Sequence, residues 1–278
     1  MGRGAVVITG TSSGIGRATA LRLDAAGFDV LAGVRRQEDG ERLRSEASDR
    51  LRPLIVDVTD ADSIAAAARS VGEVELAGLV NNAGQNSSGP IEFLPLDELR
   101  SHLEVNLVGQ VAVTQAFLPA IRRGRGRIVN ITSVGGRIVN PFLGSYHAAK
   151  WGLEAITAAL RKELRPWDIR VVAIEPGSID TEIWRKGTEQ ARELVASLPP
   201  EARELYGDRL PKALALAERL AEHSIPADRV AKAVERALTA RRPRARYIVG
   251  NDARVNIRLN QVLPPSAIDA VESRVIRG

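Results

Sequence analysis

Residues 5–16 read AVVITGTSSGIG, and this stretch decides the fold. Its first four residues are apolar and mostly β-branched, which predicts a short buried strand. The glycine-rich run 9–16 follows, and a segment of helical period at 15–26 comes next. A turn of this kind directs the free N–H groups of the helix start toward a bound phosphate. The stretch therefore predicts an α/β fold that binds an anion, such as a pyrophosphate, at its first strand–helix turn.

The rest of the chain repeats this alternation. Further apolar runs occupy 28–34, 54–58, 76–80, 127–131 and 169–174, and a short last strand is expected at 247–249. Helical patterns lie between them at 60–71, 97–121, 145–165 and 226–240. The alternation predicts a doubly wound, mainly parallel seven-stranded sheet with helices on both faces. The proline-containing region 182–225 is predicted to be a helical substrate-lid insertion within a single domain, 1–278.

Composition excludes several classes of protein and site. The 278 residues are 44% hydrophobic and 26% charged, which is ordinary for a globular domain and argues against a disordered chain or a membrane bundle. With no cysteine, disulfides, thiolate metal sites and a cysteine nucleophile are excluded. The three histidines are scattered, so no metal site is expected. The longest uncharged stretch, 105–121, is too polar to span a bilayer.

Basic charge is concentrated at the C-terminal end. The segment 241–278 carries eight arginines and three acidic residues, which accounts for the whole net charge of +5. We interpret this basic extension as a solvated surface or a subunit contact; binding to nucleic acid or to an anionic membrane surface is the alternative. No targeting segment is expected, because the first strand begins at Ala5, and a cytoplasmic location follows.

The end of the second predicted strand indicates which nicotinamide cofactor fits. NAD-binding proteins of this type usually place an acidic residue there to bind the ribose 2′-hydroxyl. Here the strand ends Gly33-Val34-Arg35-Arg36, without an acid. The guanidinium groups of Arg35 and Arg36 could pair with a 2′-phosphate. This favours NADP(H), with NAD(H) as the alternative.

A set of polar residues further along the chain suits acid/base chemistry. Tyr146 and Lys150 are four residues apart in a predicted helix, so they share one face. A nearby ammonium and the positive charge of an oxidised nicotinamide would lower the pKa of a phenol, whose ordinary value is about 10. Ser133 follows an apolar strand, where its hydroxyl could bind a substrate oxygen. The set predicts a general acid/base centre.

These motifs together resemble the short-chain dehydrogenase/reductase family, in its single-domain form with a Rossmann-type fold. The resemblance covers nearly the whole chain and is firmest over residues 4–181. The matching motifs, in order, are residues 9–16, Asp57-Val58, the sequence NNAG at 81–84, Asn106, Ser133, YHAAK at 146–150 and Pro176-Gly177.

The resemblance implies a role for each catalytic position. Tyr146 would protonate the carbonyl oxygen in reduction, or take the hydroxyl proton in oxidation. Ser133 would orient the substrate oxygen, and Lys150 would also contact the nicotinamide ribose. Asn106 would hold a water that links Lys150 to solvent.

It also implies a set of cofactor-binding residues. Asp57 and Val58 would flank the adenine, and Thr181 would bind the nicotinamide carboxamide. The full set is Gly10, Ser12, Ser13, Gly14, Ile15, Gly16, Arg35, Arg36, Asp57, Val58, Asn82, Ala83, Gly84, Tyr146, Lys150, Pro176, Gly177, Ile179 and Thr181.

The expected function is therefore an NADP(H)-dependent carbonyl reductase or alcohol dehydrogenase, acting on a small molecule as a homodimer or homotetramer. A lipophilic substrate is favoured because most candidate lining residues are apolar. They are Gln85, Val134, Gly135, Val139, Phe142, Leu143, Ile179, Ile183 and Trp184. The alternative is a non-catalytic NADP-binding sensor or scaffold of the same fold. Such proteins usually lose the tyrosine or the lysine, and both are present here.

Overall fold

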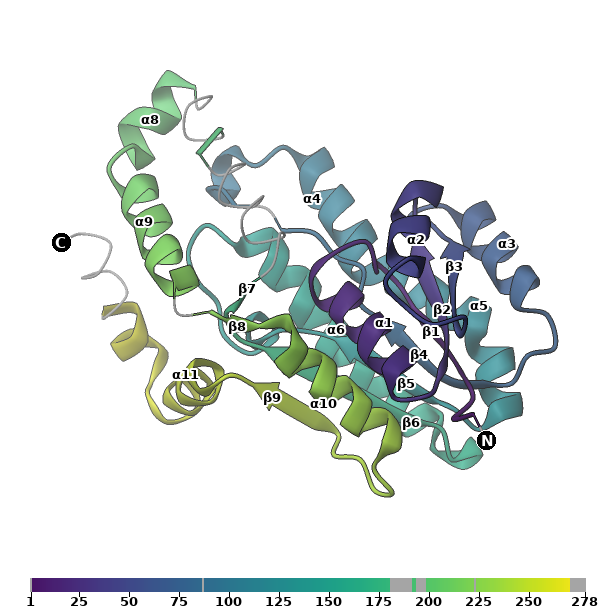
Figure 1. Ribbon diagram of the computed structural model, residues 1–278. Helices are drawn as coiled ribbons and strands as arrows, with labels where there is room; N and C mark the ends of the chain where they lie inside the picture. The colour runs from purple at the N-terminus through teal and green to yellow at the C-terminus, as the bar shows by residue number, and fades with distance from the viewer. Residues whose placement is uncertain (1, 87, 181–191, 194–198, 223, 271–278) are drawn as a thin grey trace.

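The computed structural model describes residues 2–86, 88–180, 192–193, 199–222 and 224–270. Seven strands form one sheet in the order β3-β2-β1-β4-β5-β6-β9, and every neighbouring pair is parallel. The strands are β1 Ala5–Ile8, β2 Asp29–Val34, β3 Leu51–Ile55, β4 Leu76–Asn81, β5 Arg127–Ile131, β6 Arg170–Pro176 and β9 Arg246–Val249. Figure 1 shows the helices around this sheet. The predicted doubly wound, parallel α/β fold is confirmed.

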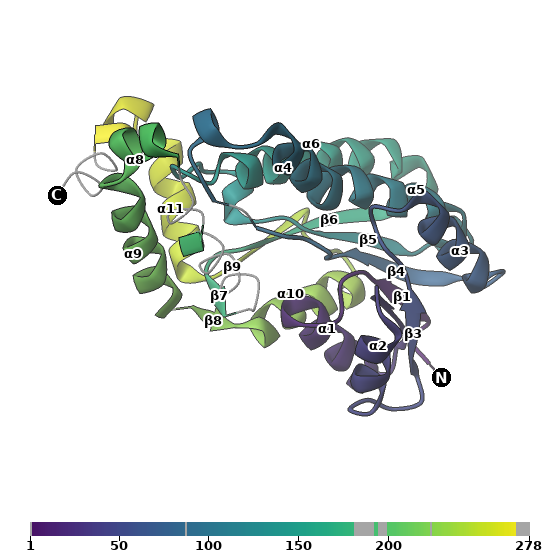
Figure 2. The ribbon, with the colours of Figure 1, turned by 90° about the horizontal axis from the view of Figure 1, so that it is seen from above.

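Helices cover both faces of the sheet, as Figure 2 shows from above. On one face lie α1 (Gly14–Ala25), α2 (Gln37–Arg44) and α10 (Ala227–Thr239). On the other lie α3 (Ala61–Val71), α4 (Leu96–Leu103), α5 (Gly109–Gly124) and α6 (Gly144–Glu163). Alternate residues of β1 serve the two faces: Val6 and Ile8 belong to one buried apolar cluster, whereas Ala5 and Val7 belong to the other.

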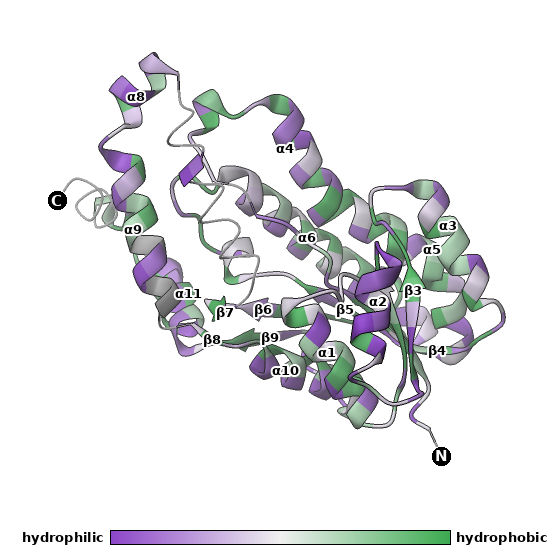
Figure 3. Ribbon diagram, turned by 45° about the horizontal axis from the view of Figure 1, so that its top comes forward, coloured by the Kyte–Doolittle hydropathy of each residue, from purple (hydrophilic) through white to green (hydrophobic). Residues whose placement is uncertain are grey.

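Helix α10 illustrates why these segments become helices. Its buried residues recur at helical spacing, and no proline interrupts it after Pro226 at its N-cap. The buried set is Val230, Ala231, Val234, Ala237 and Leu238, and Val230, Val234, Ala237 and Leu238 join the same apolar cluster as Val6 and Ile8 of β1. Figure 3 shows helices striped with polar and apolar residues, as this packing requires. Each helix is thus held by burying one face against the sheet.

Strand β3 lies three residues earlier than the predicted run 54–58. It contains Pro53, which is tolerated because β3 is the edge strand of the sheet. Val56 and Val58 are buried beyond the end of the strand, so their hydrophobicity marked core packing and not strand pairing.

The segment predicted as one helix at 97–121 is interrupted. Helix α4 passes into a π-helical turn, η2 (Glu104–Val108), before α5 begins. Gln110 holds the turn by donating its amide Nε2 to the carbonyls of Val105, at 2.9 Å, and Ala83, at 2.6 Å. An extra residue in a helical turn re-aims the side chains that follow, and here it turns Asn106 toward the end of β4.

Three further helices and a small second sheet lie among the described residues. Helices α2 and α11 (Asn251–Val262) are absent from the prediction because their sequences are mostly polar. In the predicted insertion, 182–225, the structure describes α8 (Pro200–Tyr206) and α9 (Arg209–Glu222). The strands β7 (Ile179–Asp180) and β8 (Ile225–Pro226) pair with each other. Among the described residues, no helix combines the length and apolarity that crossing a membrane requires.

Candidate active site

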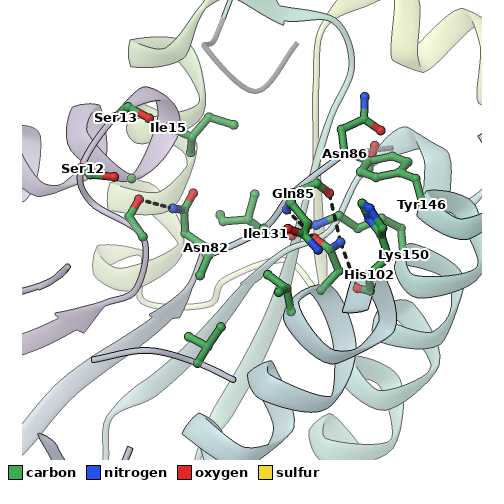
Figure 4. A pocket seen from close by; sticks show the side chains of 18 of the residues that line it. Ser12, Ser13, Ile15, Asn82, Gln85, Asn86, His102, Ile131, Tyr146 and Lys150 are labelled. Atoms are coloured by element: carbon green, nitrogen blue, oxygen red, sulfur yellow. Dashed lines mark hydrogen bonds between the residues drawn. The ribbon is translucent and has the colours of Figure 1, made fainter. Parts of the chain in front are cut away.

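A cleft of about 930 Å³ opens at the carboxyl ends of the strands. The chain leaves β1 between β2 and β4, where the strand order reverses direction, and ligands of doubly wound sheets bind at such a point. The lining comes from the turns after β1, β2, β3, β4, β5 and β6 and from α4 and α6. Figure 4 shows Ser12 and Ser13 across this cleft from Tyr146 and His102.

The turn after β1 brings backbone to backbone at contact distance. A Cβ at Gly16 would lie 2.1 Å from the carbonyl oxygen of Gly10, so only glycine fits there. Position 10 also requires glycine, for two reasons. Its φ is +68°, which other residues rarely adopt, and a Cβ there would lie 2.8 Å from the Cα of Ala83. Asn82 donates its Nδ2 to the carbonyls of Thr9, at 2.9 Å, and Gly10, at 3.0 Å. These contacts bind the first turn to the turn after β4.

The start of α1 offers uncapped backbone donors to this cleft. Ser13 occupies the N-cap without a side-chain hydrogen bond, and the first turn of α1 holds no acidic residue. The free N–H groups and the helix dipole therefore attract an anion. The cradle fits the pyrophosphate of a nicotinamide dinucleotide.

The two candidate arginines for a 2′-phosphate differ in position. Arg35 lines the cleft near Asp57. Burial raises the pKa of Asp57, but two hydrogen bonds from Thr59 and, to a smaller extent, the charge of Arg35 outweigh it, so the pKa is lowered. Arg36 is outside the lining and pairs with Asp39 at 3.0 Å, with 73% of its side chain exposed. Arg35 is therefore the arginine placed to contact a nucleotide.

Lys150 is fixed within α6. Its Nζ donates to the carbonyl of Ile131 at 2.9 Å, and only 6% of the residue is exposed. Burial lowers the pKa of Lys150 to about 8, and the negative charge of Glu154 opposes that shift. A buried amine with a pKa near working pH suits proton transfer.

Tyr146 lies one turn before Lys150, whose Nζ is 5.8 Å from the centre of the phenol ring. Burial raises the pKa of Tyr146, and a hydrogen bond with Ser133 acts in the opposite direction. The lowered pKa expected from the sequence is thus not present in the protein without nucleotide. A neutral phenol keeps its proton available for donation.

Ser133 is held at the N-cap of a 3-10 turn, η3 (Val134–Gly136). Its Oγ accepts a hydrogen bond from the N–H of Gly135 at 3.0 Å. His147 secures the same loop: its Nε2 accepts from the N–H of Asn140 at 2.9 Å, so its Nδ1 carries the proton and donates to the carbonyl of Gly135 at 2.8 Å. Burial lowers the pKa of His147, which favours this neutral form.

One turn after Lys150 on α6, Glu154 belongs to a group of two buried glutamates and two partly exposed arginines, which we call the charge network: Arg137, Glu154, Glu175 and Arg246. Arg246 Nε lies 3.1 Å from a carboxylate oxygen of Glu154 and 3.0 Å from one of Glu175. Arg137 pairs with Glu175 at 3.4 Å. Burial and the charge of Glu154 raise the pKa of Glu175. The network connects α6, β6, β9 and the loop that carries Ser133.

The cleft brings together most residues singled out from the sequence. Catalytic candidates Ser133, Tyr146, Lys150 and Asn106 all line it. So do Gly10, Ser12, Ser13, Ile15, Gly16, Arg35, Asp57, Val58, Asn82, Ala83, Gly84, Pro176, Gly177 and Ile179. Gly14 begins α1 and is outside the lining, as is Arg36. Thr181 lies outside the described residues.

Asn106 serves the loop after β4 directly. Its Oδ1 accepts from the N–H of Gln85, and its Nδ2 donates to the carbonyls of Gln85, at 3.0 Å, and His102, at 3.1 Å. Gly84 lies so close that a Cβ there would be 2.8 Å from Asn106 Oδ1. The side chain of Asn106 therefore holds the loop after β4 in place. The water that the resemblance implies at Asn106 stays a prediction.

Only some of the residues predicted to contact the substrate line the cleft. Gln85 and Ile179 line the cleft, whereas Val134, Gly135, Val139, Phe142 and Leu143 are not in the lining formed by the described residues. Ile183 and Trp184 lie outside the described residues. Phe142 instead packs against Tyr206 of α8, with ring centres 6.1 Å apart. Polar residues that sequence reasoning missed take their place, among them Asn86, Ser88, Ser101 and His102.

Comparison with known proteins gives consistent matches. A family model described as short chain dehydrogenase matches residues 4–192. The chain is 40% identical to retinol dehydrogenase 5 of Homo sapiens, over 98% of this chain and 88% of that protein. It is 38% identical to 17-beta-hydroxysteroid dehydrogenase type 6 of Bos taurus, over 97% of this chain and 87% of that protein.

A solved structure matches over nearly the full length. It is a short chain dehydrogenase from Burkholderia cenocepacia J2315 in complex with NADP, with 26% identity and a TM-score of 0.75. The match covers 99% of this chain and 98% of that one.

Proposed function

The chain belongs to the short-chain dehydrogenase family, and from that premise we propose that it interconverts a ketone or aldehyde and an alcohol with NADP(H) as preferred cofactor. The observation that carries the proposal is the convergence of Ser133, Tyr146 and Lys150 in the cleft that begins at the glycine-rich turn. The relatives named above are dehydrogenases of hydroxysteroids and retinol, and one solved relative is in complex with NADP.

Different residues of this chain would bind different parts of the nucleotide. The donors at the start of α1 would hold the pyrophosphate, and Arg35 would pair with the 2′-phosphate. Asp57 and Val58 line the same cleft as Arg35, which lies near Asp57, and they would flank the adenine. When bound, the nucleotide supplies the hydride that reduces the carbonyl carbon.

Proton transfer is the task of Tyr146. Its hydroxyl donates a proton to the carbonyl oxygen as that oxygen becomes negative, and Ser133 donates a hydrogen bond to the same oxygen. The raised pKa of Tyr146 keeps the phenol protonated at neutral pH, which suits reduction. The neighbouring Lys150 amine, which lines the same cleft, stabilises the phenolate that remains.

The test compares NADPH oxidation by wild type and Tyr146→Phe over a panel of ketones and aldehydes. Wild type should consume NADPH with at least one carbonyl compound, and the variant should lose at least about 100-fold in kcat/KM. Tyr247→Phe is the matched control, because Tyr247 lies on β9 outside the cleft lining. Full activity of Tyr146→Phe would remove Tyr146 as the acid.

A further inference from the structure

Helix α8 packs against two loops near the cleft. Tyr206, the last residue of α8, contacts Phe93 of the 3-10 turn η1 (Ile91–Phe93) and Phe142 of the loop before α6. The rings meet edge to face, with centres 6.0 and 6.1 Å apart. Figures 1 and 2 show α8 beside the segment that precedes α4. Two apolar residues of α8 and α9 complete the group, which we call the aromatic cluster: Phe93, Phe142, Ala202, Tyr206 and Leu210.

Phe142 has a backbone conformation that a bulky side chain disfavours. Its φ is +66°, in the left-handed region, where a residue with a Cβ is strained. Such a residue keeps this conformation only when contacts around it require it. Here the N–H of Gly89 donates to the carbonyl of Phe142 at 2.7 Å, and Tyr206 packs against its ring. The path of the loop before α6 therefore depends on contacts from outside that loop.

This loop, residues 137–143, joins the two groups expected to meet the substrate oxygen. It begins four residues after Ser133 and ends three residues before Tyr146. It is also tied to the first turn of α6, because the N–H of Asn140 donates to Nε2 of His147 at 2.9 Å. A shift of the loop would therefore change the position of Tyr146 relative to Ser133.

Tyr206 reaches this loop from outside the cleft. Neither Tyr206 nor Phe142 is in the lining that the described residues form. The hydroxyl of Tyr206 donates to a carboxylate oxygen of Glu92 at 2.7 Å, which ties Tyr206 to η1 as well. An effect of Tyr206 on the reaction would thus pass through the loop and not through contact with the substrate.

We propose that Tyr206 is a positioning residue for the reaction. Through Phe142 it fixes the loop 137–143, and with it the spacing of Ser133 and Tyr146. This rests on the proposed function and goes beyond it, because it makes the packing of α8 a condition for fast proton transfer. Displacing a catalytic group by about 1 Å can slow a reaction by about 100-fold, so the order of this loop sets the rate.

The test measures loop order and catalysis in the same variants. Tyr206→Phe keeps the ring and loses the hydrogen bond to Glu92, whereas Tyr206→Ala loses both. Phe142→Ala, alone and combined with Tyr206→Ala, shows whether the two residues act as a unit. Leu205→Ala is the control, because Leu205 is the neighbouring residue of α8, is 51% exposed and is outside the aromatic cluster.

Loop order is read from backbone hydrogen exchange of the protein without nucleotide, followed by mass spectrometry. Catalysis is read from kcat and KM for reduction of a carbonyl compound that wild type accepts with NADPH. In Tyr206→Ala, exchange over 137–143 should become faster by about tenfold or more, while β5 exchanges as in wild type. In the same variant, kcat should fall by about tenfold or more, and KM should change by less than about threefold.

Tyr206→Phe should retain most of kcat, since the ring contact remains, and Leu205→Ala should match wild type. The double variant should lose no more than Tyr206→Ala alone. Unchanged exchange over 137–143 in Tyr206→Ala, a loss confined to KM, or additive losses in the double variant would overturn the proposal. If wild type reduces no carbonyl compound, the proposed function fails, and hydrogen exchange still decides whether Tyr206 fixes the loop.

Discussion

The Nζ of Lys150 donates to the carbonyl oxygen of Ile131 at 2.9 Å, which ties helix α6 to the end of β5. Ser133 follows Ile131 by two residues, and Tyr146 precedes Lys150 by one helical turn. This hydrogen bond, together with the one between Tyr146 and Ser133, holds close to each other the two groups expected to meet the substrate oxygen. The amine is both a charge beside the phenol and a connection between the elements that carry the site.

Replacing Lys150 should consequently affect rate more than folding. Lys150→Met keeps the length of the buried chain but removes the ammonium and its hydrogen bond. We expect kcat/KM for carbonyl reduction to fall by about 100-fold or more, while thermal unfolding stays cooperative. Lys150→Arg should not restore activity, since the wider, planar guanidinium does not fit a buried amine site. Wild-type rates in either variant would contradict this.

The pH dependence of activity should report Glu154. Its carboxylate raises the pKa of Lys150 against burial, so removing the charge should lower that pKa below its value of about 8. We predict that in Glu154→Gln the transition near pH 8 in the profile of kcat/KM moves to lower pH. Glu163→Gln, an exposed change at the end of the same helix, should leave the profile in place. A profile unchanged in Glu154→Gln would argue against the coupling.

Stability should depend on Arg246. Arg246→Met leaves Glu154, 7% exposed, and Glu175, fully buried, without their shared partner. Breaking a buried ion pair on one side costs about 3–5 kcal/mol, and the lower end applies because Arg246 is itself 42% exposed and Arg137 remains. Urea unfolding measures the loss. Arg170→Met, which breaks an exposed pair with Asp168, should cost less than about 1 kcal/mol.

Cofactor preference should follow Arg35 and not Arg36. Arg35→Ala should lower the affinity for NADPH by about tenfold or more while affecting NADH little, because one charge-assisted contact to the 2′-phosphate is lost. Arg36→Ala should change the NADPH to NADH ratio less, since its guanidinium pairs with Asp39. Fluorescence titration of both nucleotides gives the two ratios. Equal effects of the two variants would contradict the assignment.

Stability between pH 7 and about 5.5 should respond to the buried histidines. Burial lowers the pKa of His102 and of His147, so below their ordinary pKa of about 6.5 the unfolded chain binds protons that the folded chain does not. The free energy of unfolding should therefore decrease as pH falls through this range. In His147→Gln the decrease should be smaller. An identical slope in wild type and variant would show that His147 does not contribute.

The motifs that could be recognised from the sequence are short-range ones. The glycine turn at 9–16 and the pair Tyr146 and Lys150 lie within one or two turns of chain, so spacing alone sets their geometry. Patterning gave the wrong bounds at β3, because Val56 and Val58 are apolar for core packing and not for pairing. It also missed the π-helical turn at Asn106, which depends on Gln110 reaching the carbonyl of Ala83.

The features that could not be predicted from the sequence depend on contacts between residues that are far apart in the chain. Arg246 meets Glu154 across 92 residues, and no local pattern marks that pair. In the sequence, Asn86 is an ordinary loop residue and His102 an ordinary helix residue. Only the fold brings both to the lining of one cleft. The sequence also gives no sign that Phe142, one of the expected substrate residues, packs against Tyr206 of α8.

A single-turnover experiment tests the proposed role of Tyr146 most directly. Enzyme saturated with NADPH is mixed with a reducible ketone, and the loss of NADPH absorbance is followed for wild type, Tyr146→Phe and Tyr247→Phe. We predict that Tyr146→Phe slows this step by at least about 100-fold and that Tyr247→Phe matches wild type. Equal rates in wild type and Tyr146→Phe would mean that the phenol of Tyr146 is not the proton donor.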